Sequence, residues 1–323
     1  MANRVKKDGA YPYITQFKKE PFQSYALIER QEIRSFYFSK DEQISEFAQF
    51  FERNLFDLQS PSLKNIYWFL LLKKYLKSEI TQDVKESLYE FILKCEINQD
   101  GMVGFVRAPY SKQKRGDIRS TYFALVSVKL MGYLDNYLAS KGKGIVIAGL
   151  KTFIESHDKG DRFVHCLEGC EICDKTHPAR TLFYVLEVLT LLGFEVRAYK
   201  SKYSPYIGKL KKKFSSLFQF LCLKYFDLDH KVEEEYLQFL HEFQNEDGGF
   251  SVEGTKGDIN LTFWITNVLE NYMWLLDYNP SGIYSFINSN LNRILTNKGA
   301  WDFETLIQFS KIIIILSLIW NKF

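Results

Sequence analysis

The feature that most constrains the fold is an internal repeat that occurs three times along the chain. Each copy has a glycine-containing turn that ends in phenylalanine, then a loop, then a polar residue with threonine four positions later. The clearest copy has Asp-Gly-Gly-Phe at 247–250 and Asp-Ile-Asn-Leu-Thr at 258–262. A repeat of this kind predicts stacked copies of one supersecondary unit that share a continuous core. The other two copies occupy 100–105 with 117–121 and 158–163 with 177–181.

Apolar residues recur at helical spacing almost throughout, and no convincing alternating strand pattern lies between them. We therefore expect an all-α chain in which each unit is an outer helix, a tight glycine turn and an inner helix. The inner helices expected at 118–138 and 178–193 are apolar around most of their circumference, so they need neighbours on both sides. This favours a single closed α/α toroid of about five or six helix pairs over residues 43–323, after an irregular segment at 1–42. The remaining helices are expected at 43–58, 61–76, 82–96, 144–156, 204–226, 230–245, 259–277, 280–296 and 303–321.

Composition and charge argue against several classes of protein. The 42 basic and 39 acidic residues give a net charge of only +3, which disfavours binding to a nucleic-acid backbone. The N-terminus has no apolar leader, and Glu304, Gln308 and Lys311 interrupt the apolar segment 303–320, which disfavours a membrane span. Three of the five cysteines lie close together, unlike a dispersed disulfide framework. We expect a cytoplasmic protein that does not span a membrane, and peripheral contact with a membrane stays open.

Aromatic residues are abundant, with 28 Phe and 20 Tyr, and rings of this kind suit a cavity for apolar or cationic ligands. Aligning the repeats by their threonines places several polar residues together at one end of the inner ring, where the mouth of the cavity is expected. A second interpretation is that the aspartates only cap helices and that the threonines only pack. The residues that the alignment gathers are Asp117, His177, Asp258, Arg119, Arg180 and Asn260.

The Gly-Gly-Phe turn, the loop and the Asp-x-x-x-Thr segment followed by aromatic residues resemble the repeats of protein prenyltransferase β subunits and squalene-type cyclases. The resemblance covers roughly residues 43–321. It implies an α/α toroid with a central cavity for an isoprenoid, and a helical companion subunit that the aromatic segment 11–38 could contact. In the β subunits, a catalytic zinc is held by an Asp, a Cys two residues later and a His on the next inner helix.

This chain departs from that zinc site. Asp258 stands at the position of the Asp, but Asn260 occupies the position of the Cys, and residues 301–305 contain no His. An amide cannot replace a thiolate or an imidazole as a strong zinc ligand. The segment 258–261 also matches only part of the Asp-x-Asp-Asp motif with which the cyclases protonate an alkene. The resemblance therefore predicts the fold more firmly than the chemistry.

A second candidate metal site lies in the expanded loop of the middle repeat. Cys166, Cys170, Cys173 and His177 could close a tetrahedral zinc site, and His165 is a spare ligand. A structural zinc is the first interpretation. A catalytic zinc at the cavity mouth, an iron–sulfur cluster and a loop of merely reduced thiols remain alternatives.

Two functions stand foremost, an isoprenoid-handling enzyme and a non-catalytic toroid that binds a protein or lipid and carries a structural zinc. A glycan-active enzyme is a third and weaker alternative. In the enzyme, a prenyl diphosphate or other long apolar substrate fills the aromatic cavity, and magnesium could accompany the diphosphate. The catalytic candidates are Asp258, Asp117 and His177, and the substrate-binding candidates are Arg119, Arg180, Lys256, Asn260, Tyr122, Phe183, Trp264 and Trp301.

Overall fold

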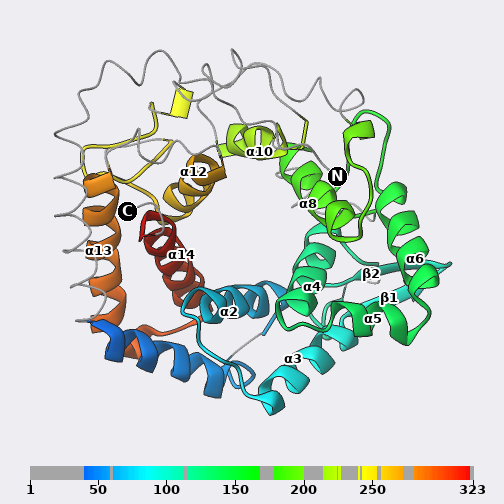
Figure 1. Ribbon diagram of the computed structural model, residues 1–323, viewed down its shortest axis with the longest axis horizontal. Coiled ribbons are helices and arrows are strands. Elements are labelled where there is room, and N and C mark those ends of the chain that lie inside the picture. Colours follow the sequence, from blue (N-terminus) through cyan, green and yellow to red (C-terminus); the bar gives the residue numbers. More distant parts are fainter. Residues whose placement is uncertain are drawn as a thin grey trace, which may run out of the picture.

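The computed structural model describes residues 40–58, 61–112, 115–167, 178–199, 214–223, 225–226, 239–240, 242–252, 256–271 and 280–320. These residues are mostly helical and surround a central opening (Figure 1). The segment 11–38, which we expect to contact a companion subunit, lies outside them, as does most of the helix expected at 230–245. The helices are residues 40–54, α2 (Leu63–Tyr75), α3 (Gln82–Lys94), α4 (Ile118–Leu130), α5 (Leu134–Ser140), α6 (Lys143–Ser156), α8 (Pro178–Leu191), α10 (Phe214–Leu223), α12 (Ile259–Asn271), α13 (Pro280–Thr296) and α14 (Phe303–Trp320), with 3₁₀ turns η2 (Arg197–Tyr199) and η5 (Lys298–Ala300).

The inner helices form a closed ring. In the described part of the chain α2 contacts α4, α4 contacts α8, α8 contacts α10, α10 contacts α12, α12 contacts α14, and α14 returns to α2. Helix 40–54, α3, α6 and α13 lie outside this ring (Figure 1). The predicted all-α toroid is therefore confirmed. Its inner helices are apolar on most sides because each packs against two inner neighbours as well as the outer layer.

The helix expected at 118–138 is wrong in its extent, because α4 ends at Leu130 and a separate helix α5 begins at Leu134. Gly132 has a φ of +82°, a conformation that costs glycine little and terminates helices. The backbone N–H of Tyr133 then donates to the carbonyl of Val128 at 2.9 Å, which closes the helix end. The chain turns outward there instead of continuing along the ring.

The described residues also contain one short two-stranded sheet that the sequence pattern did not indicate. Strands β1 (Glu96–Gln99) and β2 (Met102–Phe105) form an antiparallel hairpin. Asp100 and Gly101 make its two-residue turn with φ values of 55° and 74°, and Asp-Gly is a strong hairpin signal. With only four residues each, the strands are too short to show a clear alternating pattern.

The repeated motif is a clamp between the glycine turn and the head of the inner helix. In the first copy, the N–H of Phe105 donates to Thr121 Oγ1 at 3.1 Å, and the N–H of Asp117 donates to the carbonyl of Phe105 at 3.0 Å. The third copy makes the same two bonds around Phe250, at 3.0 and 2.8 Å. The threonines are buried, so each supplies an acceptor that water does not. The clamp thus fixes where the inner helices α4 and α12 begin.

No helix among the described residues has the length and hydropathy that a membrane crossing needs. Helix α14, the most apolar candidate, instead buries almost all of its residues from Leu306 to Ile319. Phe309 of this helix stacks on Phe47 of helix 40–54 with ring centroids 3.9 Å apart. It is therefore a core helix, as its interrupted apolar pattern predicts.

Candidate functional site

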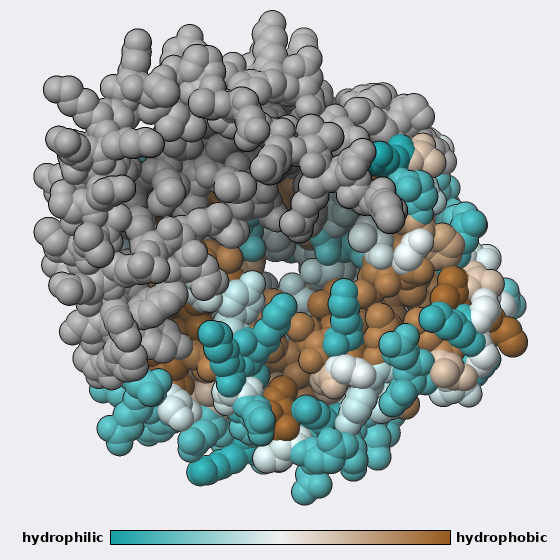
Figure 2. All heavy atoms as spheres, in the orientation of Figure 1, coloured by the Kyte–Doolittle hydropathy of each residue, from teal (hydrophilic) through white to brown (hydrophobic). Residues whose placement is uncertain are grey.

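A cavity of about 340 Å³ lies at the centre of the ring. Figure 2 shows the face toward the viewer hollowed at its centre, with both hydrophobic and hydrophilic residues at the border of the hollow. Described residues of five inner helices line it, so the cavity depends on closure of the ring. The lining residues are Lys64, Tyr67 and Trp68 of α2, Tyr122 and Phe123 of α4, Arg180 and Tyr184 of α8, Asn260 and Trp264 of α12, Lys311 of α14, and Asp258 just before α12.

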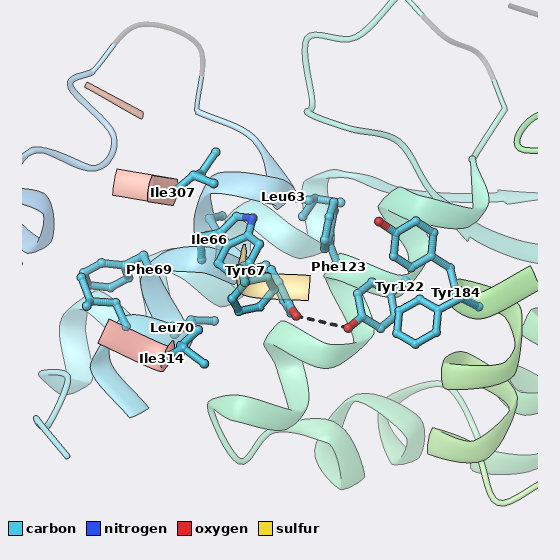
Figure 3. Packing of buried hydrophobic residues seen from close by; sticks show 14 of the residues in the cluster. Leu63, Ile66, Tyr67, Phe69, Leu70, Tyr122, Phe123, Tyr184, Ile307 and Ile314 are labelled. Atoms are coloured by element: carbon cyan, nitrogen blue, oxygen red, sulfur yellow. Dashed lines mark hydrogen bonds between the residues drawn. The ribbon is translucent and has the colours of Figure 1, made fainter. Parts of the chain in front are cut away.

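One wall of the cavity is aromatic. Tyr67 and Tyr122 point their hydroxyls toward each other at 3.2 Å (Figure 3). The ring of Tyr67 lies 4.9 Å from that of Phe123, and the ring of Tyr122 lies 4.9 Å from that of Tyr184. Burial is the largest cause that raises the pKa of both Tyr67 and Tyr122 above the ordinary value, so both hydroxyls stay protonated at neutral pH. This wall offers ring faces and neutral hydroxyls to a ligand.

The described lining also carries positive charge, from the side chains of Lys64, Arg180 and Lys311. Lys311 is only 5% exposed, its Nζ donates to Asn260 Oδ1, and it lies 5.0 Å from the centroid of the Trp68 ring. Burial lowers the pKa of Lys311 to about 8. The pKa of Lys64 is also lowered, mainly by burial. Because Asp258 is the only acidic residue among the described residues of the lining, their charge balance favours an anion.

Asp258 caps α12 and borders two pockets. Its Oδ1 accepts from the N–H of Leu261 at 2.7 Å, which confirms the capping interpretation. Asp258 and Asn260 line the central cavity and also a second pocket of about 500 Å³ between α12, α13 and α14. Lys256, a predicted substrate-binding residue, lines only this second pocket. The head of α12 is therefore the point where the two pockets meet.

Asp117 has a different environment from Asp258. It is 3% exposed and caps α4, with Oδ1 accepting from the N–H of Ser120 at 2.8 Å and Oδ2 from its hydroxyl at 2.6 Å. His165 Nε2 lies 3.3 Å from Oδ1, and burial is the main cause that lowers the pKa of this histidine. Asp117 lines neither pocket, although the repeat places it at the head of an inner helix like Asp258.

The remaining predicted residues of the cavity separate into two groups. Tyr122, Arg180, Asn260 and Trp264 line it, so the structure brings them together with Asp258. Phe183, Arg119 and Trp301 line neither pocket. Phe183 lies behind the wall, with its ring centroid 6.0 Å from that of Trp264, and the charge of Arg119 acts on Lys64. Trp301 packs between the layers, where its Nε1 donates to the carbonyl of Ile294 at 3.0 Å.

The predicted zinc loop is only partly described. Cys170, Cys173 and His177 lie outside the described residues, so zinc binding stays a prediction. Within the described ranges no group of three His, Cys, Asp or Glu residues could hold a metal. Cys166 forms an isolated antiparallel bridge with Asp117, and the carbonyl of His165 accepts from the N–H of Ile118 at 3.1 Å. The start of the loop is thus fixed against the head of α4.

The sequence repeats identify a known architecture. A family model for the prenyltransferase alpha-alpha toroid domain matches residues 38–207 and 180–293. The chain belongs to this family. No match is found among curated proteins. Among solved structures, the chain is similar to Candida albicans protein geranylgeranyltransferase-I complexed with GGPP, with 18% identity and a TM-score of 0.37. The match covers 77% of this chain and 64% of that one.

The zinc that the family resemblance implies does not fit the head of α12. A divalent ion beside Asp258 would have the amide of Asn260 as its next ligand, and Asn260 Oδ1 already accepts from Lys311 Nζ. An ammonium group at hydrogen-bonding distance repels a metal, and an amide oxygen is a weak zinc ligand. No catalytic step through zinc at this position follows from these residues.

Several lining residues have no counterpart in the sequence predictions. Lys64, Tyr67 and Trp68 lie on α2, which carries no copy of the repeated segment, and Tyr184 follows Thr181 in the second copy. Lys311 was visible only as an interruption of the apolar segment 303–320. A lysine inside an otherwise apolar helix is a signal for a buried cation, and here that signal marks the site.

Proposed function

We propose that the chain is an isoprenoid-handling enzyme whose central cavity binds a prenyl diphosphate. One observation supports this most: a single cavity of about 340 Å³ is lined both by an aromatic wall and by Lys64, Arg180 and Lys311. An isoprenoid chain packs on ring faces, and a diphosphate requires several cations. Membership of the prenyltransferase toroid family adds support.

The same residues suit the chemistry of an allylic diphosphate. The three cations neutralise the diphosphate oxygens, so the bond between the first chain carbon and oxygen breaks with its electron pair leaving on oxygen. The faces of Tyr122 and Trp264 stabilise positive charge left on the carbon chain. Asp258 and Asn260 are the polar groups that remain to orient an acceptor. A companion subunit contacting residues 11–38 would supply or shape the acceptor site.

A second candidate is a toroid that binds an isoprenoid or a protein without turnover. The observation that favours it is the absence of a thiolate or imidazole beside Asp258 in the described residues at the head of α12. Both candidates share the cavity and its ligand class when the bound molecule is an isoprenoid. They differ in whether pyrophosphate is released from the bound ligand, which an enzyme-coupled pyrophosphate assay measures.

Tryptophan fluorescence tests the proposed binding directly. We expect farnesyl or geranylgeranyl diphosphate to quench the protein's emission with saturation, because Trp68 and Trp264 line the cavity. Trp264→Phe should lose part of this response. Trp301→Phe is the matched control and should retain it, because Trp301 lies between the helical layers and lines neither pocket. Absence of saturable binding to the parent by calorimetry would refute the function.

A further inference from the structure

We propose that Tyr67 and Tyr122 act together as a hydrogen-bond donor in the wall of the central cavity, and that the ligand carries a neutral hydroxyl or carbonyl oxygen on its apolar chain. The inference rests on the proposed function, because it narrows the ligand class of the same cavity. It concerns the chain of the ligand and not its charged end. A chain made only of hydrocarbon requires ring faces and no donor.

The number of hydroxyl protons carries the inference. Each tyrosine hydroxyl has one proton to donate, and its oxygen can also accept. The hydroxyl oxygens of Tyr67 and Tyr122 lie 3.2 Å apart, and either one can be the donor (Figure 3). One of the two protons is used in the bond within the pair. The other has no acceptor among the residues that the structure describes, so the pair has one donor left for a ligand.

The pair is buried in the lining of the cavity. Tyr67 is 9% exposed and Tyr122 is 7% exposed. A buried O–H donor that lacks an acceptor destabilises the state in which it is buried. Water can accept from the pair in the ligand-free protein, but a ligand that fills the cavity displaces this water. A ligand with an oxygen in its chain replaces the lost bond, and a hydrocarbon does not.

A third tyrosine adds a second donor to the same wall. Arg180 Nε donates to the hydroxyl of Tyr184 at 3.4 Å, so this oxygen is already an acceptor. The proton of the same hydroxyl has no acceptor in the described part of the chain. Tyr184 is 3% exposed, and its ring lies 4.9 Å from that of Tyr122. The wall therefore carries two unused donor protons on neighbouring rings.

The charge around the pair favours a neutral oxygen over an anionic one. Burial is the largest cause that raises the pKa of Tyr67 and Tyr122, and the charge of Glu187 raises both further. Glu187 accepts from the hydroxyl of Tyr225. The pair therefore stays protonated and able to donate at neutral pH. The same negative charge repels an anionic oxygen at the pair, so the donor suits a hydroxyl or a carbonyl.

The competing interpretation is that the two hydroxyls only satisfy each other while their rings pack against hydrocarbon. Phe123 lies beside Tyr122 in the sequence and lines the same cavity with a ring that has no hydroxyl. Ring faces alone therefore do not require tyrosine at this wall. The two interpretations differ in one measurable property, which is the preference of the cavity for an oxygenated chain.

The experiment compares farnesol and farnesal with β-farnesene, a hydrocarbon of the same chain length. Each is titrated into the full chain and followed by tryptophan fluorescence, because Trp68 and Trp264 line the cavity. We expect the parent protein to bind the two oxygenated compounds roughly 5- to 100-fold more tightly than β-farnesene, the range for leaving a buried donor without an acceptor.

The variant that carries both Tyr67→Phe and Tyr122→Phe keeps the rings and removes the donor. It should bind β-farnesene more tightly than the parent protein does, and it should lose most of the preference for oxygen. The matched control is Tyr133→Phe, because the hydroxyl of Tyr133 accepts from Gln82 outside the cavity. This control should keep the preference of the parent protein.

The outcomes separate the inference from the function on which it rests. Equal affinity of the parent protein for farnesol and β-farnesene, or a preference that the double variant keeps, would overturn the donor pair and leave the isoprenoid proposal standing. A preference that depends on the pair, without saturable binding of farnesyl diphosphate, would support the donor pair and overturn the proposed diphosphate ligand. The comparison of the three compounds uses the parent protein, so the inference stays testable even if the double variant fails to fold.

Discussion

The fold makes the charged form of Lys311 unfavourable. Its ammonium is removed from water and receives an uncharged amide as its hydrogen-bond partner. Such a group destabilises the ligand-free protein, because the unfolded chain hydrates the charge better. Functional sites often carry strain of this kind, since the ligand relieves it.

This cost gives a prediction about stability and pH. The pKa of Lys311 is lowered from 10.5 to about 8 in the folded protein, so between these values the unfolded chain holds more protons. Stability should therefore rise with pH through this window, by at most about 1.4 kcal/mol per pH unit from this one group. Urea unfolding of the ligand-free protein at pH 7 to 10.5 measures the slope. Lys311→Met should lack this contribution, and Lys298→Met, which removes an exposed lysine paired with Glu46, should keep it; equal slopes in all three proteins would contradict the assignment.

At the scale of an element, the clamp explains why the same short motif recurs. Each clamp joins the strand-like end of a glycine turn to the head of an inner helix through two hydrogen bonds, one to a threonine hydroxyl and one between backbone groups. The aspartate of the motif caps the helix at the same point in the first and third copies. Cavity residues such as Asn260 are then placed by the helix that the clamp starts.

Thr262 tests the clamp. Thr262→Val keeps the side-chain shape but removes the acceptor for the buried N–H of Phe250, and it should cost about 1–3 kcal/mol of unfolding free energy. Thr262→Ser should recover most of that loss. Thr305→Val at the start of α14 is the matched control. Its hydroxyl donates to the carbonyl of Ala300 and to Asp302 Oδ1, both near solvent, so the loss there should stay below about 1 kcal/mol. Equal costs in chemical denaturation would show that the motif is not a clamp.

At the scale of the whole molecule, the closed ring makes distant helices depend on one another. Helix α14 contacts both α12 and α2, and α8 lies three inner helices away from it in either direction. In an open solenoid each unit contacts only its neighbours, so a substitution in one unit has little effect on the stability of distant units. In a closed ring, loosening one inner helix releases both of its neighbours and opens the cavity.

Phe309 of α14 tests this dependence. Phe309→Ala removes a fully buried ring that stacks on Phe47 and should cost about 3–5 kcal/mol. Hydrogen exchange should then accelerate in α8 as well as in α2 and α12. Phe56→Ala is the control, because Phe56 is 41% exposed and its removal should cost far less. Faster exchange confined to α14 and its direct neighbours would instead describe a chain of independent units.

The repeat and the helical periodicity were sufficient to predict the toroid, because both are local patterns that the backbone obeys. They also located the heads of α4, α8 and α12, and the caps Asp117 and Asp258 follow from the same chemistry. The hairpin and the break at Gly132 were local too, but their signals are short and were outweighed by the surrounding helical pattern.

Only the tertiary structure decided which side chains face the cavity. Asp117 and Asp258 hold equivalent places in the repeat, yet only Asp258 lines a pocket, because loop residue His165 packs over Asp117. Likewise Lys311 and Asn260 are joined by ring closure across 51 positions of sequence. Periodicity shows that a residue is buried, but whether it meets an outer helix, like Trp301, or the central cavity, like Trp264, depends on how the ring closes. The sequence by itself determined the toroid and the heads of its helices, and the packing of distant helices determined the chemistry of the cavity.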